Sequence, residues 1–185
     1  MIDADQVRAL RQAYWANGFR PVAVWLPGAC DITGQPVRGA GKRPQGDDWR
    51  ERALRDPPDA VARSVSNLAL ITGILTSPIA GIDVDVLAPW LADAVVHRIE
   101  HMLGPTPLIR TGRPPKTLLV YRLEHPLAKL STPEMFLPDG SKAQVGVLAE
   151  GQQFICDGPH PDTGQPYRWI ATRPDWRGFA ASFVG

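Results

Sequence analysis

The sequence has little cysteine and almost no excess of charge. Only Cys30 and Cys156 occur among its 185 residues. They form no Cys-x-x-Cys pair, so the sequence supports neither a zinc ribbon nor a disulfide scaffold. Its 20 lysines and arginines nearly balance 19 acidic residues and leave a net charge of +1. A basic surface for nucleic acid would therefore have to come from local clustering.

Long apolar runs are also missing, because none approaches the length that spans a bilayer. The first five residues lack the basic start and apolar core of a signal peptide. We therefore expect a cytoplasmic protein without a membrane partner. Apolar residues make up 44% of the chain and charged residues 21%, which is typical of a globular protein with a sizeable core.

Nineteen prolines and seventeen glycines are spread along the chain, which indicates short elements joined by turns. Helices are predicted over residues 3–16, 56–64 and 88–103 from their caps, apolar spacing and glycine stops. Residues 27–50 are predicted as a long loop. Strands are predicted over residues 19–26, 68–72, 79–86, 107–111, 117–123, 143–148, 152–156 and 167–170. This mixture favours an α+β domain.

The clearest chemical signal is the pair Asp83 and Asp85 within the apolar run 79–86. Residues two apart on a strand point to the same face, about 6–7 Å apart. Two such carboxylates can share hard divalent cations such as Mg²⁺ or Mn²⁺, and these ions neutralise triphosphate oxygens and activate an attacking hydroxyl. The alternative is a strand edge with two solvated aspartates. We rank it second because adjacent like charges disfavour strand pairing.

A second signal is the basic turn over residues 109–116 and the strand that follows it. Residues 110–122 contain four cations and no acidic residue, the cations being Arg110, Arg113, Lys116 and Arg122. Such a turn suits a triphosphate or a nucleic-acid backbone. Taken alone, a proline-stiffened surface hairpin with solvated charges explains it better.

Two further segments offer phosphate contacts. Lys42 and Arg43 follow a Gly-Ala-Gly sequence that lacks the spacing of a Walker A loop. His160 stands between two prolines, which would place its ring rigidly against a phosphate or sugar. A plain surface loop and a structural turn are the respective alternatives.

Residues 97–101 read His-Arg-Ile-Glu-His and match the zinc-protease pattern H-x-x-E-H. At about 100° per residue, the apolar residues of this predicted helix cover one arc; they are Leu91, Val95, Val96, Ile99, Met102 and Leu103. His97 and His101 fall on the opposite arc and are expected to face solvent. A catalytic zinc needs a third ligand and a closed pocket, so a protease is disfavoured.

Taken together, these segments resemble the prim-pol branch of the archaeo-eukaryotic primase superfamily, the N-terminal domain of bifunctional DNA primase/polymerases in phage, plasmid and mobile-element replication proteins. The resemblance runs from about residue 18 to residue 169. Its matching pieces are residues 18–22, 42–44 with Trp49, 67–73, 81–85, 110–113, and 151–154 leading to 160–164.

The resemblance implies an archaeo-eukaryotic primase fold, in which a small αβ unit joins an RRM-like mixed sheet. One domain would cover residues 1–185, with a core at about 18–170 and a tail or linker at 171–185. The implied activity is metal-dependent, templated nucleotide addition, with nucleoside triphosphates and a DNA template and primer as substrates and a fused or associated helicase as partner. Asp83 and Asp85 would be catalytic and would hold Mg²⁺ or Mn²⁺. Nucleotide contacts would come from Arg113, Lys116, His160, Arg110 and Lys42, and nucleic-acid contacts from Arg43 and Arg122.

Two positions depart from the family pattern. A histidine usually follows the Thr-Gly-Arg turn, but residues 114–117 here read Pro-Pro-Lys-Thr, so Lys116 would replace it. A third acidic residue usually lies on a later strand, where our alignment places Gly146; Glu150 is the candidate substitute. Two alternatives therefore stay open. One is a degenerate domain that binds nucleotide or DNA without efficient synthesis, and the other is a different metal-dependent phosphohydrolase or nuclease.

Overall fold

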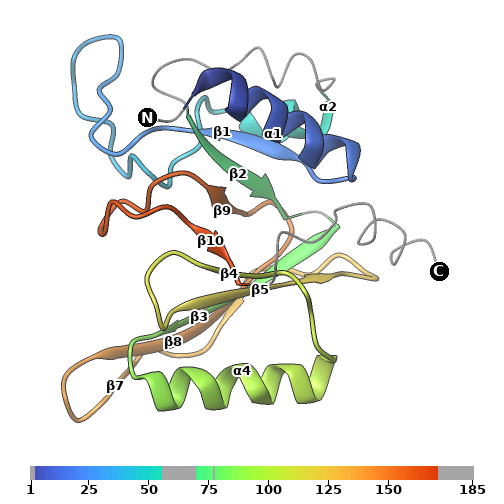
Figure 1. The fold of residues 1–185 in the computed structure, drawn as a ribbon, viewed down its shortest axis with the longest axis vertical. Coiled ribbons are helices and arrows are strands. Elements are labelled where there is room, and N and C mark those ends of the chain that lie inside the picture. The colour runs from blue at the N-terminus through green and yellow to red at the C-terminus, as the bar shows by residue number, and fades with distance from the viewer. Residues whose placement is uncertain (1–2, 56–69, 77, 171–185) are drawn as a thin grey trace. The chain divides into compact units, whose positions relative to one another are not determined.

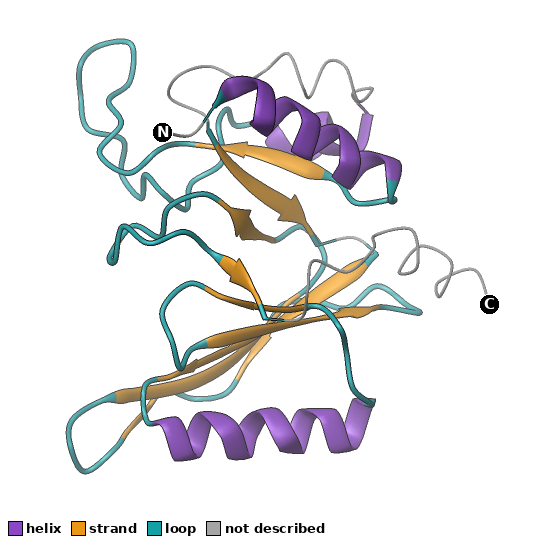
Figure 2. Cartoon of the chain, viewed as in Figure 1, coloured by secondary structure: helices purple, strands orange, loops and turns teal. Residues whose placement is uncertain are grey.

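A computed structural model describes residues 3–55, 70–76 and 78–170 of the chain (Figure 1). The chain divides into two compact units, which are described separately. The first unit comprises Met1–Leu75, Gln153–Tyr167 and Asp175–Gly185, and the second comprises Thr76–Gln152 and Arg168–Pro174. Both units contain helices and strands, as Figure 2 shows.

The first unit is built on a three-stranded antiparallel sheet of order β1-β2-β9. Its elements are α1 (Ala4–Ala16), β1 (Pro21–Val24), α2 (Trp49–Arg55), β2 (Ile71–Leu75) and β9 (Gln153–Asp157). The predicted cap of α1 is confirmed, because the Asp3 carboxylate accepts a hydrogen bond of 3.0 Å from the Asp5 N–H. That bond satisfies one of the backbone donors that every helix N-terminus leaves unpaired.

The two helices of this unit contact β2 through different kinds of residue. From α1, the buried Arg11 donates hydrogen bonds to the Thr72 hydroxyl at 3.1 Å and to the Ile71 carbonyl at 3.0 Å. Burial lowers the pKa of Arg11 to about 10, so these polar partners are needed to hold its charge inside the unit. From α2, the contact is apolar: Ala53 and Trp49 pack against Val22, Val24, Ile71, Leu75, Ile155 and Tyr167.

The second unit is a seven-stranded sheet of order β10-β4-β5-β3-β8-β6, with β7 paired to β8. Its elements are β3 (Ile79–Val86), α4 (Pro89–Leu103), β4 (Ile109–Thr111), β5 (Thr117–Arg122), β6 (Leu130–Ser131), β7 (Met135–Phe136), β8 (Lys142–Leu148) and β10 (Arg168–Trp169). Every pairing in it is antiparallel. The prediction of a mixed sheet is therefore wrong. Strands β3 and β4, which α4 connects, are not neighbours, because β5 lies between them and pairs antiparallel with each.

Helix α4 covers one face of this sheet (Figure 1). The core beneath it contains Val84, Val86, Ala88, Ala92, Leu119 and Ala143, with Leu91, Val95, Val96 and Ile99 of the helix packed against them. Burying each large aliphatic side chain contributes about 1.5–3 kcal/mol. Met102 and Leu103 were expected on the same arc but are 65% and 56% exposed, because the packed part of α4 ends at Ile99.

The structure confirms the expected α+β class, with three helices and antiparallel sheets among the described residues. Strand 79–86 is confirmed to the residue, and the helix expected over 88–103 begins one residue later. Helix α2 and the short strands β6 and β7 were not predicted. The helix expected over 56–64 lies outside the described residues, and the strand expected over 68–72 runs from 71 to 75. None of the helices in the described ranges is long and apolar enough to cross a membrane.

Candidate metal and nucleotide site

Asp83 and Asp85 lie on an interior strand of the second unit. Strand β3 pairs with β5 on one side and β8 on the other, so the alternative of a strand edge is wrong. Val84 and Val86 are buried beneath α4, whereas the two aspartates alternate with them and are half-buried. Because successive residues of a strand point to opposite faces, both carboxylates lie on the face away from α4.

The strand register places a row of residues across this face. Asp83 lies opposite Leu118 of β5, and Leu118 lies opposite Arg110 of β4. Two strand spacings amount to about 10 Å, which an arginine side chain and a bound phosphate can bridge together. Arg110 is only 8% exposed. The buried guanidinium and the carboxylate pair therefore share one face of one sheet.

Lys116 joins the same group through Asp85. Its Nζ forms an ion pair with Oδ1 of Asp85, and the two side chains are 29% and 34% exposed. Lys142 lies two residues from Gln144, which is opposite Asp85 on β8. The pKa of Lys142 is raised chiefly by its hydrogen bond to Glu134, with a smaller contribution from the charge of Asp85. Opposite charges thus surround Asp85.

Gly146 lies directly opposite Asp83 on β8, at the position where the resemblance described above would place a third acidic residue. A Cβ atom built on Gly146 would meet only the Leu130 carbonyl oxygen, at 3.9 Å. That distance is an ordinary van der Waals contact, so packing does not require glycine at this position. The fold therefore has room for a carboxylate side chain at position 146.

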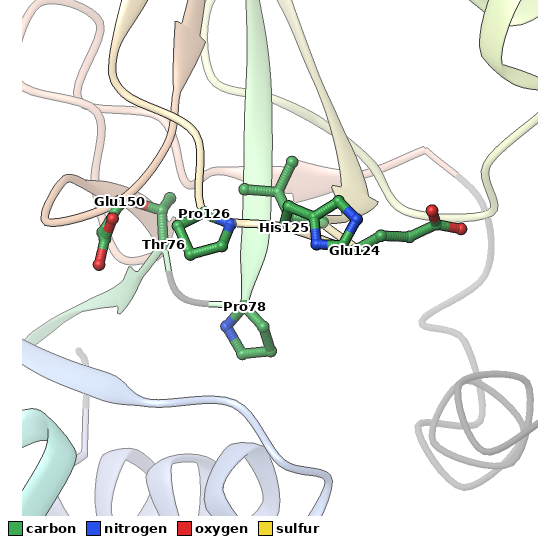
Figure 3. Close-up of a pocket in the computed structure, with 7 residues that line it drawn as sticks. Thr76, Pro78, Glu124, His125, Pro126 and Glu150 are labelled. Carbon is green, nitrogen blue, oxygen red and sulfur yellow. The ribbon is translucent and has the colours of Figure 1, made fainter.

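Glu150 does not replace the missing carboxylate. It lies four residues beyond Gly146, about 13 Å along an extended chain, and lines a different pocket near the start of β3 (Figure 3). This pocket has a volume of about 100 Å³ and is also lined by Thr76, Pro78, Leu123, Glu124, His125 and Pro126. The Glu150 and Glu124 side chains lie on opposite sides of His125 and Pro126 in Figure 3.

Two of the predicted basic residues lie outside the row of Asp83, Leu118 and Arg110. One is at the far end of β5 and the other is in the turn before β5. Arg122 is paired with Ile79, four residues from the row of Asp83, so it does not join the carboxylate group. Arg113 is exposed in the turn between β4 and β5, and its carbonyl accepts a hydrogen bond from the Lys116 N–H at 3.0 Å.

The remaining three predicted residues belong to the first unit, where two loops bring them near one another. Gly41 has a φ of +91°, and a Cβ there would lie 2.9 Å from Cβ of Pro161. The loop carrying the exposed Lys42 and Arg43 therefore packs closely against the residue that follows His160. The Lys42 carbonyl is also held by Gln153 Nε2 at 2.8 Å.

His160 itself is held inside this unit and is 7% exposed. Its Nδ1 accepts a hydrogen bond of 3.2 Å from the Asp162 N–H, and its ring lies 5.2 Å from the ring of Tyr167. An accepting Nδ1 places the proton of the neutral ring on Nε2. His160 is thus a fixed donor within the first unit.

The carboxylate pair fits a hard divalent cation. Mg²⁺ is commonly held through one or two carboxylates, with waters and substrate phosphates completing its octahedron, and Asp83 and Asp85 offer two such groups on one face. Within the described ranges, no group of three or more His, Cys, Asp and Glu side chains is placed to hold a metal. His97 and His101 are exposed on α4, as expected. The residues present therefore suit an ion that shares its coordination with substrate.

The model of the family Prim-Pol, described as bifunctional DNA primase/polymerase, N-terminal, matches residues 11–178. The match covers residues of both units. No curated protein matches the chain.

Proposed function

The chain belongs to the Prim-Pol family of bifunctional DNA primase/polymerase N-terminal domains, and from this premise we propose that it is a nucleotidyltransferase that extends a DNA primer on a template. The observation that carries the proposal is the Asp83 and Asp85 pair on an interior strand, with Arg110 on the same sheet and Lys116 ion-paired to Asp85. Carboxylates for a metal beside cations for phosphate are what phosphoryl-transfer chemistry requires.

In this reaction the primer hydroxyl attacks the α-phosphorus of the incoming nucleoside triphosphate, one P–O bond forms, and the bond to pyrophosphate breaks. Asp83 and Asp85 would hold Mg²⁺ or Mn²⁺, which supplies charge neutralisation for the phosphate oxygens when bound. Arg110 and Lys116 would orient the triphosphate by charge-assisted hydrogen bonds. We extend the same role to Arg113, Lys42 and His160, and assign Arg43 and Arg122 to the nucleic-acid backbone.

The proposal includes the archaeo-eukaryotic primase fold, with the first unit as its small αβ part and the second as its RRM-like sheet, within one domain. The order β4-β5-β3-β8 with α4 following β3 supports this, since an RRM is a four-stranded sheet backed by helices. The further elements of the proposal rest on the family alone. They are a phage, plasmid or mobile-element origin, a cytoplasmic location, and a helicase as partner.

The test is extension of a labelled DNA primer on a template, with Mn²⁺ or Mg²⁺ and either deoxynucleotides or ribonucleotides. We expect Asp83→Asn to lower incorporation by about 100-fold or more, the scale of losing a charge-stabilising group from an active site. Asp93→Asn, an exposed position on α4, removes the same charge elsewhere in the second unit and should leave incorporation unchanged. Undiminished incorporation by Asp83→Asn would overturn the assignment.

The degenerate domain is a second candidate, and Gly146 opposite Asp83 is the observation that favours it. It predicts that the wild-type protein binds nucleotide in the presence of Mn²⁺ but leaves the primer at its original length. Equilibrium nucleotide binding, measured beside the extension assay, separates the two candidates. Metal-dependent shortening of the primer would instead indicate the phosphohydrolase or nuclease alternative.

A further inference from the structure

The hairpin formed by β7 and β8 carries an exposed aromatic side chain at one edge of the sheet in the second unit (Figure 1). Phe136 of β7 is 69% exposed and lies opposite Lys142 of β8. Within the residues that the structure describes, β7 pairs with β8 alone. Single apolar side chains are common on protein surfaces, so the meaning of Phe136 depends on where its ring lies.

Phe136 lies on the same face of the sheet as the two aspartates. Side chains directly opposite each other in an antiparallel pair share a face, so Phe136 shares its face with Lys142. Lys142 and Gln144 are two apart on β8, and Gln144 lies opposite Asp85. Two strand spacings and two residues along β8 separate Asp85 from Phe136, which amounts to about 12 Å.

The residues on either side of Phe136 lie on the opposite face. Met135 lies opposite Ala143, a member of the core beneath α4. Leu137 packs against the same core, and its N–H donates a hydrogen bond of 2.8 Å to the Ser141 carbonyl. Because successive side chains of a strand alternate between faces, this placement turns Phe136 away from α4. The hairpin thus presents the ring on the carboxylate face.

Lys142 places a positive charge beside the ring. Its Nζ forms an ion pair with Glu134, and the two side chains are 41% and 44% exposed. An exposed pair of this kind contributes little to stability, so a backbone phosphate can replace the carboxylate. The cations assigned to the triphosphate, Arg110 on β4 and Lys116 just before β5, lie on the other side of β3. A phosphate at Lys142 therefore belongs to a different molecule, a strand that carries one phosphate for each base.

The floor of this face is low between Asp83 and the edge of the sheet. Asp83 lies opposite Gly146, and Gly146 lies opposite Ser131 of β6. A Cβ on Gly146 would meet only the Leu130 carbonyl oxygen, at 3.9 Å, so the one side chain in this row beyond Asp83 is the small Ser131. An extended strand can therefore cross β8 without displacing a large side chain.

Resting on the proposed function, we propose that Phe136 is a stacking platform for a base of the single-stranded DNA template, with Lys142 contacting the adjoining phosphate. Aromatic side chains on an open sheet face stack nucleobases in RRM and OB-fold proteins, and such stacking accepts any base. The platform holds the template as it reaches the carboxylate pair. It adds a contact to bases, whereas Arg43 and Arg122 are assigned to the nucleic-acid backbone.

The experiment measures binding of a fluorescein-labelled single-stranded DNA of mixed sequence to the whole chain by fluorescence anisotropy, with EDTA and without nucleotide. Phe136→Ala removes the ring. Phe136→Leu keeps an apolar side chain without an aromatic face, and Phe136→Trp enlarges that face. Met135→Ala is the matched control, because Met135 is 55% exposed on the other face of the same short strand. Thermal melting of each variant checks folding.

We expect Phe136→Ala to bind this DNA about 5- to 150-fold more weakly than the wild type, the cost of losing one base–aromatic stack by alanine substitution. Phe136→Leu should lose most of the same affinity, and Phe136→Trp should keep it. Met135→Ala should bind like the wild type. Lys142→Met should weaken binding and lower the slope of log affinity against log salt concentration by about 1, as expected for one lost phosphate contact.

Equal DNA affinity in Phe136→Ala and the wild type would overturn the proposal. An equal loss in Met135→Ala, or full binding by Phe136→Leu, would overturn it too, because aromatic stacking on one face would then not be the cause. Weaker Mn²⁺-dependent nucleotide binding by Phe136→Ala, with unchanged DNA binding, would show that the ring holds the incoming base instead of the template.

These outcomes are separate from the test of the proposed function, because the DNA-binding assay contains neither metal nor nucleotide. A protein that extends primers while its Phe136→Ala variant binds DNA like the wild type contradicts only the role of Phe136. A Phe136→Ala variant that loses DNA binding, in a protein that never extends primers, supports that role and contradicts only the polymerase function.

Discussion

Replacing Gly146 with aspartate would place a third carboxylate directly across the strand pair from Asp83. Opposite residues of an antiparallel pair have Cβ atoms about 4.5–5.5 Å apart, within reach of a shared cation. The space is available, since a Cβ on Gly146 meets only the Leu130 carbonyl oxygen at 3.9 Å. Gly146→Asn is the matched control, because it has the same shape and the same chain entropy but no charge.

The structure predicts that Gly146→Asp lowers the melting temperature without metal and raises it when Mn²⁺ is bound. Without metal, like charges opposite one another cost about 0.2–1 kcal/mol, so the aspartate variant should melt about 1–4 °C below the asparagine variant. With Mn²⁺ at about 100 times its dissociation constant, binding adds about 2.7 kcal/mol to the folded state. The aspartate variant should then gain about 5–10 °C in melting temperature.

The assay is thermal melting of both Gly146 variants with and without Mn²⁺, followed by primer extension. We expect the aspartate variant to bind Mn²⁺ more tightly than the wild type and to extend primers faster. An equal Mn²⁺-induced shift in the two variants would show that residue 146 does not face the ion, and would refute the assignment of Asp83 and Gly146 to one face.

Two further predictions concern the first unit. Gly41→Ala should lower the free energy of unfolding in urea by about 1–3 kcal/mol more than Gly34→Ala, because φ is positive at both but only the Cβ at Gly41 would come within 2.9 Å of a Pro161 atom; equal losses would contradict the close packing of this loop. Burial raises the pKa of the Tyr14 hydroxyl well above 10.0, so the folded protein keeps a proton that the unfolded chain loses near pH 10. The contribution of Tyr14 to the free energy of unfolding should be fully present below pH 10 and should be lost as the pH rises from there toward the higher pKa of the folded state. Tyr14→Phe should flatten this decline and cost about 1–2 kcal/mol at pH 7, because Asp157 loses its hydroxyl donor; an unchanged alkaline slope would refute the reasoning.

Local signals in the sequence determined the parts of the fold that lie nearest the carboxylates. Alternating apolar residues predicted β3 with its two aspartates on one face, and Gly104 predicted the end of α4. These features depend on residues within one element, so the chain needs no distant partner to specify them. The short strands β6 and β7 have no such pattern and form only because β8 offers them an edge.

The residues around Asp83 were predicted from the resemblance, but their mutual placement was decided by the sheet. The resemblance predicts Lys116 as a phosphate contact, but the sequence contains no signal that pairs it with Asp85. That ion pair exists because β5 lies beside β3. The exposure of Met102 at the end of α4 could likewise not be predicted from the sequence. Helical spacing gives the direction of a side chain but not how far the sheet surface beneath it extends.

Sequence alone thus determined that a carboxylate pair would stand on one face of a strand, because side-chain alternation is a property of any extended chain. Only the tertiary structure decided that Asp85 faces an ammonium group and Asp83 faces a glycine. Strand order and register make that difference, because they bring together residues far apart in the chain.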